Sequence, residues 1–426
     1  LEEANLPGVS IAVSKDEKVI YAKGYGYADV ENKQPMTPEI QLRTASVAKV
    51  ITTTALGKLL SEHKINLDAP IKTYVPYIDS QYAHLTLRQL TGHTSGMIHR
   101  PKGKAYKKKQ YTNIQESTQL MKAPLLFEPD TQYQYSTHAF NLVAAAIEGA
   151  SGQSFETYLN QEVFRPLGMQ QTFPENIKQL TKKDAQLYYL KDHKLKKEKP
   201  TNASYKLAGA GFRSTPTDLV KMVHGYTNGF ITSEAKEMIF KSHQLKDGTK
   251  TQVGVTWRSS IDAFGNKVIE HAGSWRGTRT VVVHYPEDNM NIAMMINADC
   301  PVFIEETAHI IAQLFREQSV KSVPINTIDT NVTVDVSFNN TETTHQGHFS
   351  FQHNQGMLKV EGSNFLATTP IYYLGYGKHY SAVTPHGFVY MTLEGNSEIR
   401  SHLFLYHNRN SRHPIENKPF ASFVVK

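Results

Sequence analysis

Ser46-Val47-Ala48-Lys49 opens a predicted helix that runs to Ser61 and follows a strand-like region. The spacing places Lys49 one turn beyond Ser46 on the same side of that helix. The free N–H groups of a first helical turn favour negative charge on a hydroxyl there, and an amine kept partly neutral by burial can accept its proton. The stretch therefore predicts an activated serine. Apolar residues at helical spacing predict one buried face, formed by Ala48, Ile51, Ala55 and Leu59.

The Ser-x-x-Lys spacing is weak evidence by itself, because it occurs twice more in this chain. In Ser61-Glu62-His63-Lys64 the serine falls near the end of the same predicted helix. In Ser233-Glu234-Ala235-Lys236 the acidic residue and the helical run that follow indicate an ordinary N-cap. The choice among the three serines therefore depends on the surrounding sequence.

Six short stretches, in a fixed order along the chain, provide that context. They are residues 7–13 (PGVSIAV), 43–49 (RTASVAK), 85–97 (LTLRQLTGHTSGM), 166–169 (PLGM), 208–211 (AGAG) and 271–273 (HAG). With them the chain resembles the serine β-lactamase-like superfamily, in the branch of class C β-lactamases, low-molecular-weight penicillin-binding proteins, D-aminopeptidases and related esterases. The resemblance covers residues 1–318. It implies an α+β fold, with an antiparallel sheet flanked by helices and a helical subdomain.

The family's second motif is Tyr-x-Asn, and Tyr135-Ser136-Thr137 resembles it best. This stretch follows a turn and precedes a helical pattern, with Thr137 where Asn is usual. The resemblance implies that Tyr135 is the acid/base group beside Ser46 and Lys49. Two literal matches, Tyr111-Thr112-Asn113 and Tyr226-Thr227-Asn228, occur in polar, turn-rich surroundings and are read as a loop tyrosine beside a turn asparagine.

The family's third motif, Lys-Thr-Gly or His-x-Gly on a strand, resembles His271-Ala272-Gly273. The resemblance implies that these three residues contact the substrate. Gly273 has no Cβ, so its backbone can approach a carbonyl closely. The resemblance also places the backbone N–H groups of Ser46 and Ser274 in an oxyanion hole, where each such donor contributes roughly 3 kcal/mol. A further match, His345-Gln346-Gly347, lies beyond this region and is read as a turn.

The mechanism implied is acyl transfer through a covalent Ser46 intermediate that water then releases. Lys49 and Tyr135 share the proton of Ser46, and the sequence leaves open which of them is the first base. A serine hydrolase for peptides (D-amino-acid-containing or cell-wall-type) or esters, penicillin-binding-protein-like, is the favoured function. A class C-like β-lactamase and a catalytically silent binding protein are the alternatives.

Two departures from the family pattern bear on the substrate. Thr137 offers one hydroxyl where Asn offers an amide donor and an acceptor, and His271 is mostly neutral near pH 7 if its pKa is ordinary. Both changes weaken the grip on the side-chain amide and carboxylate of a β-lactam, so poor β-lactamase activity is expected. Arg276 can either supply a carboxylate anchor or be an ordinary loop arginine.

Composition agrees with this class. The 426 residues carry 46 Lys and Arg against 39 Asp and Glu, and the net charge of +7 gathers partly in residues 102–109 and 178–199. These basic runs lack stacking aromatics, so no nucleic-acid partner is expected. Cys300 is the single cysteine, which excludes an intramolecular disulfide, and no stretch is long and apolar enough to span a membrane. The expected partner is a small-molecule or peptide substrate, without cofactor or metal.

The resemblance implies that the protein is located in the bacterial periplasm or envelope, or is secreted. It leaves open an association with the bacterial cell envelope. No signal segment is recognised at the start of this sequence.

The pattern of predicted elements changes along the chain. A hairpin is predicted over 9–28, helices dominate from 46 to 169, and four strands follow at 251–259, 267–271, 278–285 and 291–297, then a helix at 304–315. Residues 319–327 are read as a linker. Residues 328–426 alternate short strands with turns, which predicts a small antiparallel β-barrel or sandwich similar to the lipocalin-like appendages of some family members.

Overall fold

The computed structural model describes residues 6–316, except 104, 108, 192–193, 263–265 and 301–303, and after these the strands between residues 330 and 425. The linker predicted at 319–327 lies outside the described residues.

A seven-stranded sheet forms the centre of the molecule, in the order β3-β2-β1-β12-β11-β10-β9. The N-terminal hairpin pairs β1 with β12, so the start of the chain joins strands some 280 residues later, with Val9 opposite Ile296. The predicted hairpin and antiparallel sheet are confirmed. The strands are β1 (Gly8–Lys15), β2 (Lys18–Asp29), β3 (Gln34–Pro35), β9 (Arg258–Ile261), β10 (Lys267–Trp275), β11 (Thr278–Tyr285) and β12 (Met290–Ile296).

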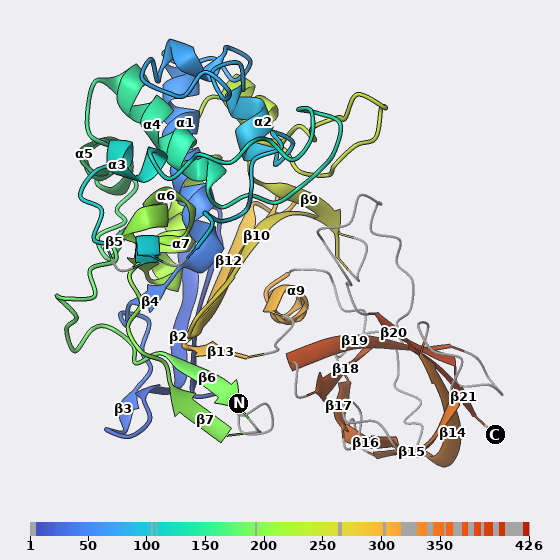
Figure 1. Ribbon diagram of the computed structural model, residues 1–426. Helices are drawn as coiled ribbons and strands as arrows, with labels where there is room; N and C mark the ends of the chain where they lie inside the picture. The colour runs from blue at the N-terminus through green and yellow to red at the C-terminus, as the bar shows by residue number, and fades with distance from the viewer. Residues whose placement is uncertain are drawn as a thin grey trace.

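Both faces of the sheet are buried at β12, which explains why its residues, apart from the buried Asn291, are apolar rather than alternating. Ala293 and Met295 belong to one core, which contains α1 and α7 (Pro216–His224). Ile292 and Met294, on the opposite face, pack in a second core with α9 (Ile304–Gln313). Figure 1 shows the sheet nearly edge-on, with α7 on one side and α9 on the other.

Helix α1 (Ala48–Ser61) lies in the middle of the larger core, and every residue except Lys58 and Ser61 is buried. The prediction of a single buried face was therefore wrong, because other helices cover the remaining sides. The buried threonine hydroxyls are satisfied by nearby acceptors, as in the bond from Thr52 to the Ala208 carbonyl. The other α-helices are α2 (Leu87–Thr91), α3 (Ile114–Thr118), α4 (Ala139–Ser151), α5 (Phe155–Tyr158), α6 (Leu207–Ala210) and α8 (Ser233–Phe240).

The strand predicted at 251–259 is largely wrong. Only β9 forms, from Arg258 to Ile261. Gln252 and Thr256 have positive φ angles of 59° and 73°, which a strand cannot contain. Two smaller sheets complete the domain: β4 (Leu42–Arg43), β8 (Phe212–Ser214) and β5 (Phe173–Pro174), and β13 (Ala298–Asp299), β6 (Tyr188–Lys191) and β7 (Lys194–Lys197).

The strands described after residue 329 pair with their neighbours in sequence and close into an eight-stranded antiparallel barrel. Closure comes from pairing between its first and last strands, with Val334 opposite Val425. The strands are β14 (Thr330–Phe338), β15 (Thr344–Gln352), β16 (Gln355–Val360), β17 (Thr369–Tyr373), β18 (His379–Thr384), β19 (Gly387–Glu394), β20 (Arg400–Phe404) and β21 (Ala421–Val425).

Candidate active site

Ser46 lies in a short 3₁₀ turn, η1 (Ala45–Val47), directly before α1. Ala45 has a φ of 45°, a left-handed conformation that costs energy for any residue with a Cβ. Strand β10 passes close to this turn. A Cβ placed on Gly273 would lie 2.5 Å from the Thr44 carbonyl oxygen and 2.9 Å from the Ser46 nitrogen. The glycine therefore lets β10 approach the backbone that carries Ser46.

Lys49 is fully buried, and its amine contacts three neutral oxygens. Lys49 Nζ lies 3.3 Å from Ser46 Oγ and 3.1 Å from Thr137 Oγ1, and donates to the Gly209 carbonyl at 2.7 Å. Burial lowers the pKa of Lys49 well below its usual value. Among the described residues no carboxylate accepts from this amine to stabilise an ammonium, so the amine can be neutral and accept a proton.

Tyr135 lies beside the same serine. Its phenol hydrogen-bonds with Ser46 and Thr137, and burial raises the pKa of Tyr135 to about 12 despite these bonds and the nearby Arg258. Lys49 Nζ is 4.8 Å from the centre of the Tyr135 ring. The phenol is therefore protonated near neutral pH and can donate that proton.

His93 supports the other side of Tyr135, with ring centroids 4.3 Å apart. Burial lowers the pKa of His93 well below its usual value, so its Nδ1 is free to accept the Ser136 N–H at 3.2 Å. His99 Nδ1 accepts the Thr137 N–H at 3.3 Å in the same way. Burial lowers the pKa of His99 to about 4. Two neutral histidines therefore hold the Tyr135–Thr137 backbone.

His271 lies on β10, where that strand runs past the end of its neighbour. Strand β9 pairs with β10 only as far as Glu270, so the edge of residues 271–275 is open toward the serine. His271 Nδ1 donates to the Ala272 carbonyl at 2.9 Å. Burial lowers the pKa of His271 well below its usual value, and Arg258 and Lys49 lower it further. The ring is therefore neutral near pH 7, and the reason is burial rather than the ordinary pKa assumed from the sequence.

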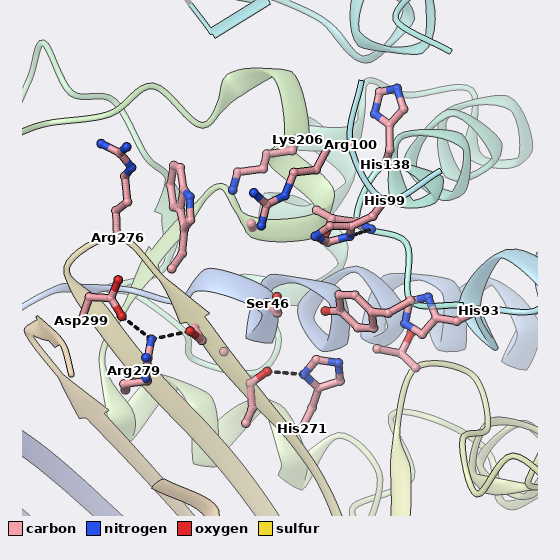
Figure 2. Close-up of a pocket in the computed structure, with 18 of the residues that line it drawn as sticks. Ser46, His93, His99, Arg100, His138, Lys206, His271, Arg276, Arg279 and Asp299 are labelled. Atoms are coloured by element: carbon pink, nitrogen blue, oxygen red, sulfur yellow. Dashed lines mark hydrogen bonds and ion pairs between the residues drawn. The ribbon is translucent and has the colours of Figure 1, made fainter. Parts of the chain in front are cut away.

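A cavity of about 700 Å³ joins these groups. Figure 2 shows Ser46 at its centre and His271 on one wall. Lys49 contacts Ser46 Oγ, and the other sequence-predicted residues line the cavity. These are Tyr135, Thr137, His271, Ala272, Gly273, Ser274 and Arg276. Arg276 is exposed at the rim and pairs with Glu198 at 3.4 Å.

The competing motifs lie elsewhere. Ser61 Oγ donates to the Gly57 carbonyl at the end of α1. Ser233 is the first residue of α8 and not its N-cap, which is Thr232, because the threonine hydroxyl accepts the Ala235 N–H. Tyr226 is a core residue bonded to Thr54. Tyr111 packs in a separate small cluster with two other tyrosines.

Several cavity residues had no role in the sequence-based prediction. Arg258 lines the cavity and pairs with Glu305 at 3.2 Å. His93 belongs to a stretch that carries the family resemblance, so a signal for it existed. His99, Arg100 and Lys206 have no motif, and only the fold brings them to the site.

Across the described part of the chain, no group of three or more His, Cys, Asp or Glu side chains could hold a metal ion. Among the same residues, no helix has the length and apolar character needed to cross a membrane.

A family model described as Beta-lactamase matches residues 1–314. The chain belongs to the beta-lactamase family. Its relatives include the human mitochondrial serine beta-lactamase-like protein LACTB, which is 30% identical over 313 residues. That alignment covers 56% of this chain and 57% of the human protein, so the chain spans less than two thirds of the relative's length.

Solved structures of the family share the fold. The octameric penicillin-binding protein homologue from Pyrococcus abyssi has a TM-score of 0.63 at 21% identity, covering 100% of this chain and 97% of that one. A D-stereospecific amidohydrolase from Streptomyces sp. has a TM-score of 0.59 at 20% identity, covering 69% and 90%. These comparisons confirm the predicted beta-lactamase and transpeptidase-like fold.

Proposed function

We propose that this member of the beta-lactamase family is a serine hydrolase that acts on peptides or esters through an acyl-enzyme on Ser46. The observation that carries the proposal is the environment of Lys49. Its amine is fully buried, has a lowered pKa and lies 3.3 Å from Ser46 Oγ. A neutral amine in that place is a general base for the serine hydroxyl.

Lys49 and Tyr135 carry out different proton transfers in the proposed reaction. Lys49 receives the Ser46 proton as the hydroxyl attacks the carbonyl carbon of the substrate. Tyr135, which keeps its proton because its pKa is about 12, donates to the leaving nitrogen or oxygen and is reprotonated from Lys49. This order makes Lys49 the first base. Water then attacks the acyl-enzyme by the reverse sequence.

We assign the stabilisation of the tetrahedral oxyanion to the backbone N–H groups of Ser46 and Ser274. The absence of a side chain on Gly273 and the open edge of β10 support this assignment. Each donor is expected to stabilise the transition state by roughly 3 kcal/mol.

The proposed substrate is either a peptide, of a kind that contains D-amino acids or resembles cell-wall peptides, or an ester. The neutral His271 and the single hydroxyl of Thr137 argue against efficient β-lactam hydrolysis, because neither reproduces a charged lysine or an asparagine amide. The structural neighbour from Streptomyces sp. is a D-stereospecific amidohydrolase, which agrees with amide chemistry on this fold.

Intact-mass measurement after incubation with a fluorophosphonate, followed by peptide mapping, tests the proposal. We expect one adduct on Ser46, no adduct in Ser46→Ala, and an unchanged adduct in the control Ser61→Ala, which alters a serine of the same sequence pattern. Penicillin is expected to acylate slowly or not at all.

A stable penicillin adduct on Ser46 would instead indicate a penicillin-binding transpeptidase or carboxypeptidase. Rapid penicillin turnover would indicate the β-lactamase alternative. Absence of any fluorophosphonate adduct would refute the hydrolase and favour a catalytically silent binding protein.

A further inference from the structure

The cavity around Ser46 extends to a group of basic side chains that the acyl-transfer chemistry does not use. Lys206 and Arg100 both line it, and Figure 2 shows them reaching in on the side across from His271. Lys206 directly precedes α6, whose Gly209 carbonyl accepts from Lys49. The same short segment therefore carries Lys206 and contacts the Lys49 amine beside Ser46.

Lys206 is nine-tenths buried, with 9% of its surface exposed. Its Nζ lies 3.3 Å from the centre of the Trp275 ring and 5.6 Å from that of Tyr205. Among the residues that the structure describes, no oxygen accepts a hydrogen bond from this amine. A buried amine without an acceptor is costly, because neither water nor a protein group replaces its lost hydration.

The carboxylates near this wall are already engaged. Glu175 accepts from Arg43 Nη2 at 2.8 Å and from Arg213 Nε at 3.2 Å, and all three side chains are buried. Glu198 pairs with Arg276 at 3.4 Å. Arg100 has no acidic partner within the described ranges. The wall therefore carries more positive than negative charge. Burial lowers the pKa of Lys206 well below its usual value, and the nearby Lys49, Arg43 and Arg100 lower it further.

Trp275 holds the lysine in position. The guanidinium of Arg43 lies 4.2 Å from the centre of the same ring and is itself fixed by Glu175. Trp275 also follows Ser274, the proposed oxyanion donor, on β10. The Lys206 amine is therefore preorganised at a defined place relative to the reacting carbonyl.

We propose that Lys206 and Arg100 form a subsite for an anionic group, a carboxylate or a phosphate, carried by the substrate of Ser46. The inference rests on the proposed function, because the anion is part of the acylating molecule. An anion would supply the acceptor that the Lys206 amine lacks, and its charge would favour the protonated form of that amine. Charge-assisted hydrogen bonds from Lys206 and Arg100 would then orient the scissile bond over Ser46.

Matched ester pairs test the subsite. Mono-4-nitrophenyl glutarate and its methyl ester place the charge, or its neutral analogue, on the acyl side. The acetyl esters of 3-hydroxybenzoate and of methyl 3-hydroxybenzoate form the second pair, in which the charge, or its neutral analogue, lies on the leaving group. Acetylated 3-hydroxyphenyl phosphate carries a phosphate in place of that carboxylate. We expect kcat/KM to favour the charged member of one pair by about tenfold, the effect typical of one charge-assisted contact.

The ratio of kcat/KM between the charged and the neutral ester is expected to fall to near unity in Lys206→Met and to persist in Lys206→Arg. It is expected to be unchanged in the control Lys241→Met, which removes an exposed lysine. Equal preference in wild type and Lys206→Met would overturn the subsite, as would wild type with no preference for any charged ester. A preference limited to the phosphate ester, or to a carboxylate ester, identifies which of these two anionic groups the subsite binds.

A binding measurement separates this inference from the proposed function. Trp275 is one of two tryptophans, so titration with glutarate or inorganic phosphate is expected to change the fluorescence of wild type and Ser46→Ala, but not of Lys206→Met. Anion binding without labelling of Ser46 would refute only the hydrolase. Labelling without anion binding or preference would refute only the subsite. Thermal melting of each variant checks that it is folded.

Discussion

Replacing Lys49 with methionine tests the proposed base directly, because methionine fills much of the same buried volume without an amine. The amine that is lost lies 3.3 Å from Ser46 Oγ and 3.1 Å from Thr137 Oγ1. We expect Lys49→Met to slow fluorophosphonate acylation of Ser46 by about 10²- to 10⁴-fold, as is usual when a general base is removed. That range corresponds to roughly 3 to 5 kcal/mol of activation free energy. Quenched-flow labelling with intact-mass detection measures the rate.

The same variant has a distinct signature in stability. Burial lowers the pKa of Lys49, so at pH values between the folded and unfolded pKa the unfolded chain binds a proton that the folded chain does not. The free energy of unfolding of wild type therefore rises with pH up to the unfolded value of about 10.4. Methionine lacks this contribution. Within that window, the stability of Lys49→Met relative to wild type is expected to fall by up to about 1.4 kcal/mol per pH unit, measured by urea unfolding.

Lys221→Met is the matched control, because Lys221 is also a helical lysine that donates to a carbonyl, that of Gly168 at 3.0 Å, but does not line the cavity. It is expected to label at the wild-type rate. Acylation of Lys49→Met within about twofold of wild type would refute the role of Lys49 as base. A relative stability of Lys49→Met that does not vary with pH would show that the lysine is charged in the folded protein.

Three further substitutions test other parts of the site. Gly273→Ala places a Cβ 2.9 Å from the Ser46 nitrogen and should disturb the oxyanion hole, which would slow fluorophosphonate labelling by about 10²-fold. A variant that labels at the wild-type rate would contradict this prediction. Tyr135→Phe should slow turnover of an ester by about 10²-fold, whereas the core variant Tyr226→Phe should leave it unchanged; equal rates in both would remove the phenol from the mechanism. Glu175→Gln leaves Arg43 buried without its carboxylate and should cost about 3 to 5 kcal/mol in urea unfolding, and an unchanged midpoint would refute that account.

Local patterns were sufficient for much of the fold. Alternation and turn residues predicted the hairpin of β1 and β2, and the predicted strand at 278–285 is β11. The strand predicted at 251–259 was largely wrong, although the composition of this segment is typical of a strand. Gln252 and Thr256 adopt positive φ angles, which interrupt the extended backbone. The helix at 46–61 was correctly placed, but its burial was underestimated, since packing by distant helices has no local signal.

The proposed reactive groups could all be named from the sequence. Ser46 and Lys49 are neighbours on one helical turn, so their proximity follows from local geometry. Tyr135 and His271 required motifs, because they reach the serine only through the fold. The tertiary structure decided the surroundings of the Lys49 amine, since its acceptors Thr137 and Gly209 lie 88 and 160 residues away in the sequence. It likewise decided that Lys206 has no acceptor in the described chain, because desolvation depends on every segment packed around a group and not on its neighbours in sequence.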